Sequence, residues 1–121
     1  MLGRRYGAPV QRAILALPAS DRPELVQDVF MLALLKLRDD TGEIGATQAE
    51  LATEAEVAPR DVASAVAVLA RMGVLRLELH QGREAWFINP HVAWCGSLHE
   101  RARVAARVPP PSIKPARDPD A

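Results

Sequence analysis

Residues 47–89 read TQAELATEAEVAPRDVASAVAVLARMGVLRLELHQGREAWFIN, and this stretch decides the fold. It opens with a capping box: the Thr47 hydroxyl accepts from a free amide of a helix N-terminus, and the Glu50 side chain reaches back to the amide of Thr47. Pro59 suits the first turn of a second helix, because no amide donor is needed there, and Gly73 suits its end. The stretch therefore predicts two helices joined by a short turn.

A β-hairpin is predicted directly after the second helix. Three leucines alternate with charged or polar residues over residues 75–80, which is the period-two pattern of a half-buried strand. Gln81 and Gly82 supply the turn, and residues 84–88 return as the second strand.

A largely buried helix is predicted before the capping box. Ser20 or Asp21 is expected to cap it, Pro23 fits its first turn, and apolar residues then recur at helical spacing as far as Leu37. The run Asp39-Asp40-Thr41-Gly42 should stop the helix.

The ends of the chain extend this unit. Residues 1–19 are interpreted as an N-terminal arm or a short helix, and residues 98–108 as an arginine-rich amphipathic helix. Residues 109–121 are polar and rich in proline, so we expect a disordered tail.

Two groups of residues carry a resemblance to known families. The first is similar to the pattern of bacterial winged helix-turn-helix DNA-binding proteins and comprises Thr47-Gln48-Ala49-Glu50-Leu51-Ala52, Val57, Val62, Val66, Leu69 and Gly73-Val74-Leu75. The second resembles the segment that closes the wing in RepL-type plasmid replication proteins and reads Trp86-Phe87-Ile88-Asn89-Pro90-His91-Val92-Ala93-Trp94-Cys95-Gly96-Ser97. The expected fold is mainly α with a small β-hairpin (α+β). It is a winged helix-turn-helix domain over residues 20–97 with N- and C-terminal extensions.

The resemblance implies that the second helix of the motif enters the major groove of DNA while the hairpin follows the backbone. The expected DNA-binding residues are Thr47, Gln48, Arg60, Asp61, Ser64, Arg71 and Arg83.

Position suggests a role for each of these residues. Arg60 lies in the first helical turn, which favours phosphate, and its side chain can reach a base edge. Ser64 can bond to a base or a phosphate, whereas Arg71 is better placed for the backbone. Asp61 repels phosphate but can accept from cytosine. Arg83, at the tip of the hairpin, is expected to contact a phosphate or the minor groove.

Thr47 and Gln48 begin the preceding helix and are interpreted as phosphate contacts. Glu56 occupies a turn position where the motif often has glycine, so it places an acid near the DNA side.

Charge is balanced over the chain but unevenly distributed. The sequence has 15 basic and 15 acidic residues, which argues against attachment to nucleic acid by bulk charge alone. Residues 39–56 contain acids and no base, whereas residues 57–108 carry seven arginines and four acids. The later half of the domain is therefore the basic half.

Other classes of function find little support in the sequence. His91, Cys95 and His99 are spaced four residues apart, but Gly96 and Ser97 interrupt the helix that would align them, so no metal site is predicted. There is no glycine-rich phosphate loop and no nucleophile beside a base, so neither an enzyme nor a cofactor is expected.

The location and the partners follow from similar arguments. The single cysteine and the lack of a long apolar run favour a cytoplasmic protein without a membrane segment. The expected partners are double-stranded DNA and a second copy of the chain, with residues 1–19 or 98–108 as candidate dimer contacts.

The resulting hypothesis is a regulator of replication or transcription in a bacterial plasmid or mobile element. A repressor unrelated to replication and a protein-interaction winged helix that does not bind DNA are the alternatives.

Overall fold

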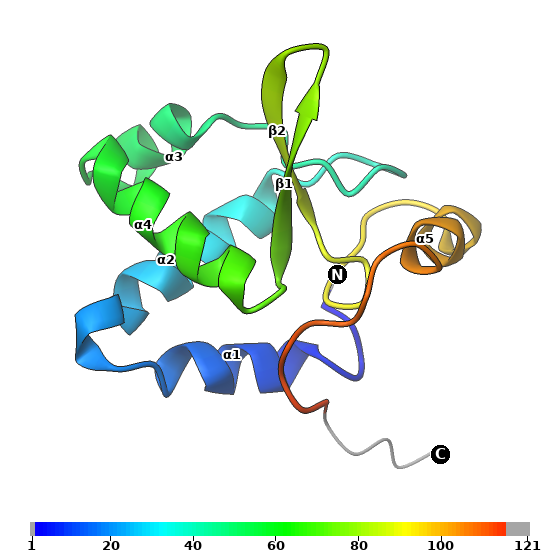
Figure 1. Cartoon of the computed structure of the whole chain (residues 1–121), viewed down its shortest axis with the longest axis horizontal. Coiled ribbons are helices and arrows are strands. Elements are labelled where there is room, and N and C mark those ends of the chain that lie inside the picture. The colour runs from blue at the N-terminus through cyan, green and yellow to red at the C-terminus, as the bar shows by residue number, and fades with distance from the viewer. Residues whose placement is uncertain (1, 116–121) are drawn as a thin grey trace.

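The computed structural model describes residues 2–115, and within that range the chain combines five α-helices with a two-stranded antiparallel hairpin (Figure 1). The elements run in the order α1 (Gly7–Leu15), the 3-10 helix η1 (Ala19–Asp21), α2 (Pro23–Leu35), α3 (Gln48–Ala55), α4 (Pro59–Arg71), β1 (Leu75–His80), β2 (Arg83–Ile88) and α5 (Leu98–Ala105). The mixed α+β class predicted from the sequence is confirmed. None of the described helices has the length and apolar character needed to cross a membrane.

The helix α2 lies at the centre and is enclosed by α1, α3 and α4. Val26, Val29, Phe30 and Ala33 are fully buried. These residues follow the i, i+3, i+4, i+7 spacing of a single stripe, and the buried Leu25 and Leu34 widen it on either side. The predicted buried helix is confirmed on this face, whereas Met31 and Leu35 on the other side are exposed.

The start of α2 differs from the sequence expectation. Pro23 is its first residue, as predicted, but the N-cap is Arg22, which has a left-handed backbone (φ 53°) and makes no side-chain capping bond. Ser20 and Asp21, the expected caps, instead lie in η1. The prediction of the cap was wrong because a separate 3-10 turn precedes the helix.

The capping box of α3 is confirmed. The Thr47 hydroxyl accepts from the amide of Glu50, and the Glu50 carboxylate accepts from the amide of Thr47, each at 3.1 Å. Glu56 ends α3 in a left-handed conformation (φ 57°), which is the conformation that makes glycine frequent at this turn.

The helix α4 follows this turn and packs on α2 and α3. Its inner face is buried and comprises Val62, Ala65, Val66, Leu69 and Met72. Gly73 has a positive φ of 75° and carries the chain from α4 into β1.

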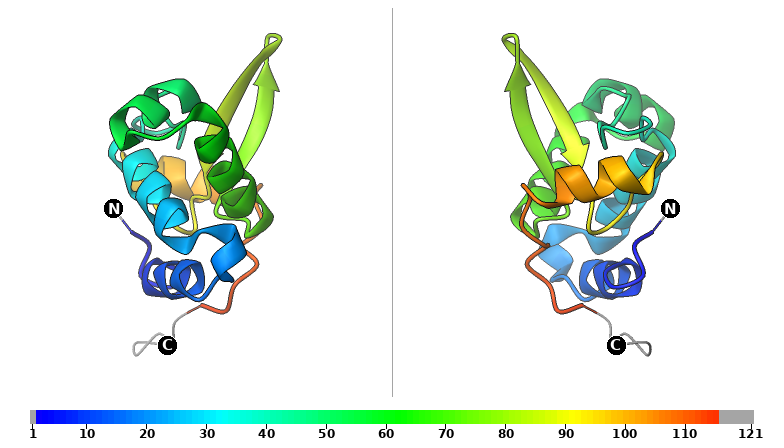
Figure 2. Two further views of the ribbon diagram at one scale, coloured as in Figure 1. Left: turned by 90° about the vertical axis from the view of Figure 1, so that its left-hand side faces the viewer. Right: turned by 90° about the vertical axis from the view of Figure 1, so that its right-hand side faces the viewer.

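The hairpin has the predicted turn. Gln81 and Gly82 both have positive φ (52° and 77°), as a two-residue hairpin turn that matches the strand twist requires. Strand β1 pairs with β2 from Leu75 opposite Ile88 to His80 opposite Arg83, so β2 begins one residue earlier than expected. The hairpin projects beyond the helices in both side views (Figure 2).

A short extended segment lies along the outer edge of β2. The amide of Ile44 donates to the carbonyl of Trp86 (2.9 Å), and the amide of Ile88 donates to the carbonyl of Gly42 (2.8 Å). The indole of Trp86 also donates to the carbonyl of Ala46 (2.7 Å). This segment anchors β2 to the loop that leads into α3.

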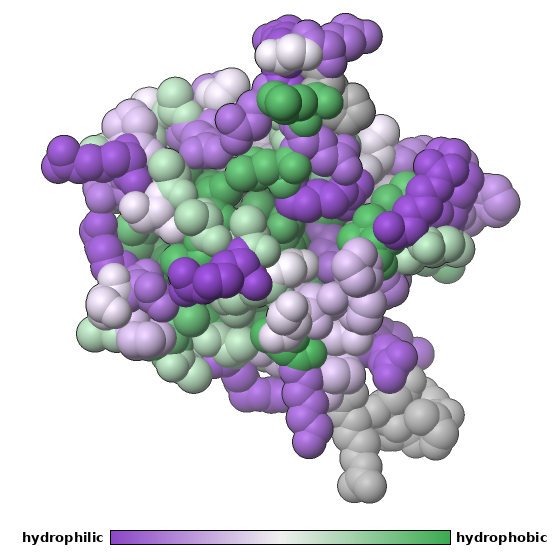
Figure 3. Space-filling view, in the orientation of Figure 1, coloured by the Kyte–Doolittle hydropathy of each residue, from purple (hydrophilic) through white to green (hydrophobic). Residues whose placement is uncertain are grey.

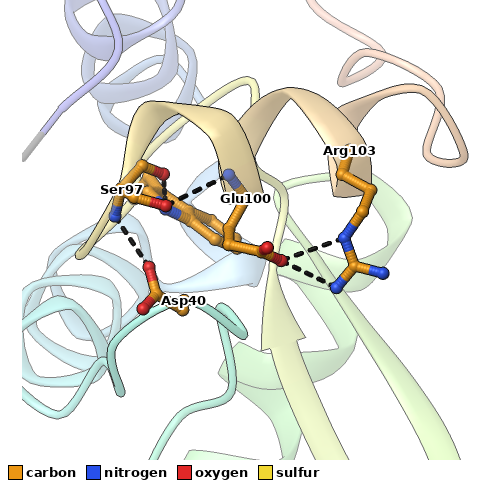
Figure 4. A network of polar contacts seen from close by, with 5 residues as sticks. Asp40, Ser97, Glu100 and Arg103 are labelled. Atoms are coloured by element: carbon orange, nitrogen blue, oxygen red, sulfur yellow. Dashed lines mark hydrogen bonds and ion pairs between the residues drawn. The ribbon is translucent and has the colours of Figure 1, made fainter.

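The helix α5 is held by a polar network (Figure 4). The Ser97 hydroxyl caps it by accepting from the amide of Glu100 (3.2 Å), and Asp40 accepts from the amide of Ser97 (2.7 Å). Glu100 pairs in turn with Arg103 (2.7 Å). The helix ends at Ala105, three residues before the predicted end.

The termini are more ordered than the sequence suggested. Of the two readings of residues 1–19, the helix is present as α1, with Val10 and Ile14 fully buried. The segment after α5, expected to be disordered, is held as far as Ile113: Ser112 donates to the carbonyl of Met72 (2.9 Å), and Ile113 packs against the core. The rest of the predicted tail, residues 116–121, lies outside the described residues.

Asn89 joins three parts of the chain that are distant in sequence. Its amide nitrogen donates to the carbonyls of Gly73 (2.8 Å) and Pro109 (2.9 Å), and its amide oxygen accepts from the amide of His91 (2.9 Å). The side chain is 3% exposed, so these partners have no ready replacement in water.

We therefore predict that Asn89→Ala lowers the free energy of unfolding by about 2 kcal/mol or more, because it removes the three hydrogen bonds of a buried side chain. Urea denaturation followed by circular dichroism measures the effect. Gln11→Ala is the control, since the half-buried Gln11 side chain makes no hydrogen bond with the described residues. Equal small losses in both variants would contradict the assigned role of Asn89.

Candidate nucleic-acid interface

The side of α4 that faces away from α2 is exposed along the helix. It presents Arg60, Ala63, Ser64, Ala67 and Arg71. Arg60, Ser64 and Arg71 are three of the expected DNA-binding residues, and Ala63 and Ala67 lie beside them. The outer side therefore carries two cations, one hydroxyl and two small apolar side chains.

Arg60 and Ser64 lie near the N-terminus of α4. The Arg60 side chain makes no hydrogen bond or ion pair with the described part of the chain, so its guanidinium is available to a ligand. The Ser64 hydroxyl donates to the Arg60 carbonyl one turn back (3.0 Å), and its oxygen keeps capacity to accept.

Asp61 and Arg71 are engaged with the start of α2. Asp61 accepts from Arg22 (2.8 Å) and from the amide of Ala58 (3.3 Å), while Arg71 pairs with Asp21 (3.2 Å). These two ion pairs clamp α4 to the junction between η1 and α2. The Asp61 carboxylate thus has a structural partner, and its charge is offset by Arg22.

The bond from Arg22 lowers the pKa of the Asp61 carboxyl below its ordinary value of 3.8, with partial burial acting against it and the Ala58 amide acting with it. Asp61 is therefore ionised wherever the protein is near neutral pH.

A groove of about 860 Å³ lies between α4 and the hairpin. Three predicted site residues line it: Thr47 and Gln48 from the start of α3, and Arg83 from β2. The α4 side of the groove is formed by Ala63, Val66 and Ala67, and the hairpin side includes Leu77, Ala85 and Trp86. The remaining lining residues are Arg38, Glu43, Ile44, Gly45, Ala46, Glu50, Gln81 and Glu84.

The groove is not strongly basic. Its ionised lining comprises Arg38 and Arg83 against Glu43, Glu50 and Glu84, and Arg38 lies 3.5 Å from Glu43. The hydrogen bonds from Thr47 lower the pKa of Glu50, so this carboxyl stays charged at neutral pH. The cations available to a polyanion are thus at the rim, on Arg83 and on the exposed stripe of α4.

The predicted site residues therefore fall into three places. Thr47, Gln48 and Arg83 share the groove, and Arg60 and Ser64 lie on the outer stripe with unpaired side-chain capacity. Asp61 and Arg71 are paired with Arg22 and Asp21, and Arg71 lies at the end of the outer stripe.

Sequence reasoning did not find the apolar floor of the groove or the two clamping ion pairs. Asp21 and Arg22 lie 50 and 39 residues from their partners, and no local pattern indicates such contacts.

The clamp makes stability depend on pH. The folded pKa of Asp61 is depressed, so its contribution is present above the unfolded value of 3.8 and is lost as the pH falls through the folded value. We predict that Asp61→Asn is less stable than the parent near neutral pH and that this difference shrinks as the pH falls below 3.8.

Urea denaturation at several pH values measures this difference. Arg22→Met is the matched variant, because it removes the donor and should abolish most of the pH-dependent difference. A difference that stays constant from neutral to acid pH would show that Arg22 does not act on the Asp61 carboxylate.

Comparison with known proteins adds no relative from which a role could be carried over. The sequence matches no protein-family model, no curated protein and no solved structure at a significant level. What the site can do is therefore argued from its own residues.

Proposed function

We propose that the chain is a winged helix-turn-helix protein that binds double-stranded DNA through the outer stripe of α4 and the hairpin tip. One observation carries the proposal: α4 is buried on one side and uncovered on the other, and a projecting hairpin stands beside the uncovered side (Figure 1). A helix of this diameter fits the major groove, which is about 12 Å wide.

The unpaired cations support this mode of docking. In it, Arg60 meets a base edge or a phosphate near the N-terminus of α4, where the helix dipole also favours an anion. Arg83 follows the backbone or the minor groove from the hairpin. Thr47 and Gln48 approach phosphates from the start of α3, and Ser64 supplies a hydrogen bond beside Arg60.

The biological role we propose is regulation of replication or transcription in a bacterial plasmid or mobile element. A homodimer binding a short palindromic or repeated site would raise the affinity above that of a single, thinly charged face. The position of the bound site distinguishes the roles, since an origin indicates replication and a promoter indicates transcription.

A protein ligand is the second candidate, and the composition of the groove favours it. Leu77, Trp86, Ala63 and Ala67 give an apolar lining beside three carboxylates. Figure 3 shows hydrophobic surface on the hairpin beneath its hydrophilic tip, and more between the hairpin and the helices. Such a surface suits an apolar protein segment flanked by basic residues better than it suits the phosphate backbone of DNA.

Fluorescence anisotropy with duplex DNA at two salt concentrations tests the proposal. We predict tighter binding to DNA flanking the gene than to random duplex. In Arg60→Ala plus Arg83→Ala, each substitution should cost about 1–3 kcal/mol of binding free energy. Each lost phosphate contact should also reduce the slope of log K against log salt concentration by about 0.9.

Arg5→Ala plus Arg12→Ala is the matched control. It removes the same charge from exposed residues in and just before α1, away from the hairpin (Figure 1). Equal losses in the two double variants would indicate nonspecific charge effects. No binding of the parent to either DNA at low salt would favour the protein-ligand candidate.

A further inference from the structure

The two edges of the hairpin differ. On the outer edge of β2, the carbonyl of Trp86 and the amide of Ile88 bond to residues 42–44. No hydrogen bond from the described residues reaches the outer edge of β1. An open edge of this kind is a template for another strand.

The hydrogen-bonding groups on the open edge belong to the leucines of β1. The amide of Asn89 donates to the carbonyl of Val74, so the even-numbered residues of β1 face β2. The amides and carbonyls of Leu75, Leu77 and Leu79 therefore point outward. Leu77 and Leu79 also have exposed side chains (43% and 77%).

We propose that β1 pairs antiparallel with β1 of a second copy of the chain, with Leu77 opposite Leu77 across a two-fold axis. Leu75 of each copy then faces Leu79 of the other, and each opposed leucine pair exchanges both main-chain hydrogen bonds. The two hairpins become one continuous sheet.

The charges of Arg76 and Glu78 favour this register over the neighbouring ones. Only the odd-numbered residues of β1 point their main-chain groups toward the second copy, so each of them must lie opposite another odd-numbered residue. Neighbouring registers therefore differ by two residues. In the register centred on Leu77, Arg76 of each copy faces Glu78 of the other. Shifting by one step toward either end places Arg76 opposite Arg76 or Glu78 opposite Glu78, and like charges directly opposite destabilise a pair.

Arg76 and Glu78 already form an ion pair within one chain. The Arg76 Nε donates to Glu78 (3.0 Å), and the guanidinium lies over the ring of Phe87 at 4.9 Å. A second carboxylate beside Arg76 would extend the existing pair into a four-charge network.

Apolar contact also favours a second copy of the chain as the partner of β1. The leucine side chains lie on the face of β1 opposite that of Arg76 and Glu78. A second copy therefore brings leucines to leucines on one face and arginines to glutamates on the other. The sequence Leu75-Arg76-Leu77-Glu78-Leu79 is thus complementary to itself when reversed.

Sedimentation velocity of the full chain over a range of concentrations, without DNA, tests the pairing independently of the proposed function. The parent is expected to dimerise. Arg76→Glu and Glu78→Arg should each raise the dimer dissociation constant about tenfold or more, because like charges then face each other twice. The double variant, with both charges exchanged, should dimerise like the parent.

The decisive experiment mixes the two single variants. Arg76→Glu offers only acids and Glu78→Arg only bases, so an equimolar mixture should form heterodimers although neither variant dimerises alone. Circular dichroism checks that each variant is folded. Leu79→Gln changes a side chain that is already exposed and should weaken dimerisation without affecting the fold.

A parent that stays monomeric would overturn the proposal. A dimer that survives both single charge changes would overturn it as well, and would direct attention to α1 or α5, the other candidate contacts. Failure of the mixture to associate would show that Arg76 and Glu78 do not face each other.

Discussion

The burial of α2 is the constraint on which the other elements depend. Its buried residues form one wide apolar face that includes Leu25 and Leu34, and α1, α3 and α4 all contact the helix. Removing this apolar surface from water is the main favourable term available to a chain of this size. Because α4 turns its own apolar stripe toward α2, its polar stripe has to face outward. The exposed face of the candidate interface thus follows from the way α4 packs against the core.

Ion pairs then decide which charges on α4 remain available. Asp61 and Arg71 are held by Arg22 and Asp21, while Arg60 keeps its guanidinium free within the described structure. The net charge of zero means that long-range attraction contributes little to encounter with a polyanion. Recognition through this face would therefore rest on a few well-placed contacts rather than on a basic field.

Local chemistry made much of the fold predictable. The capping box at Thr47, the two-residue turn at Gln81 and Gly82, and the alternation along β1 each depend on neighbours within a few residues. The left-handed Arg22 before α2 and the packing of residues 109–113 depend on tertiary contacts and were not predicted. The same division applies to the site: the exposed stripe of α4 followed from helical period, whereas the apolar groove required the hairpin to be placed beside it.

The bonds made by Asn89 and Ser112 bear on the order in which the chain can complete its fold. The carbonyls at the end of α4 find these partners only when residues 89 and 112 have been synthesised. The core helices are all encoded before that point. The junction between α4 and β1 is therefore tied to the C-terminal segment, which lies far from it in sequence. A ligand that moves the hairpin would act on residues 109–112 through these bonds.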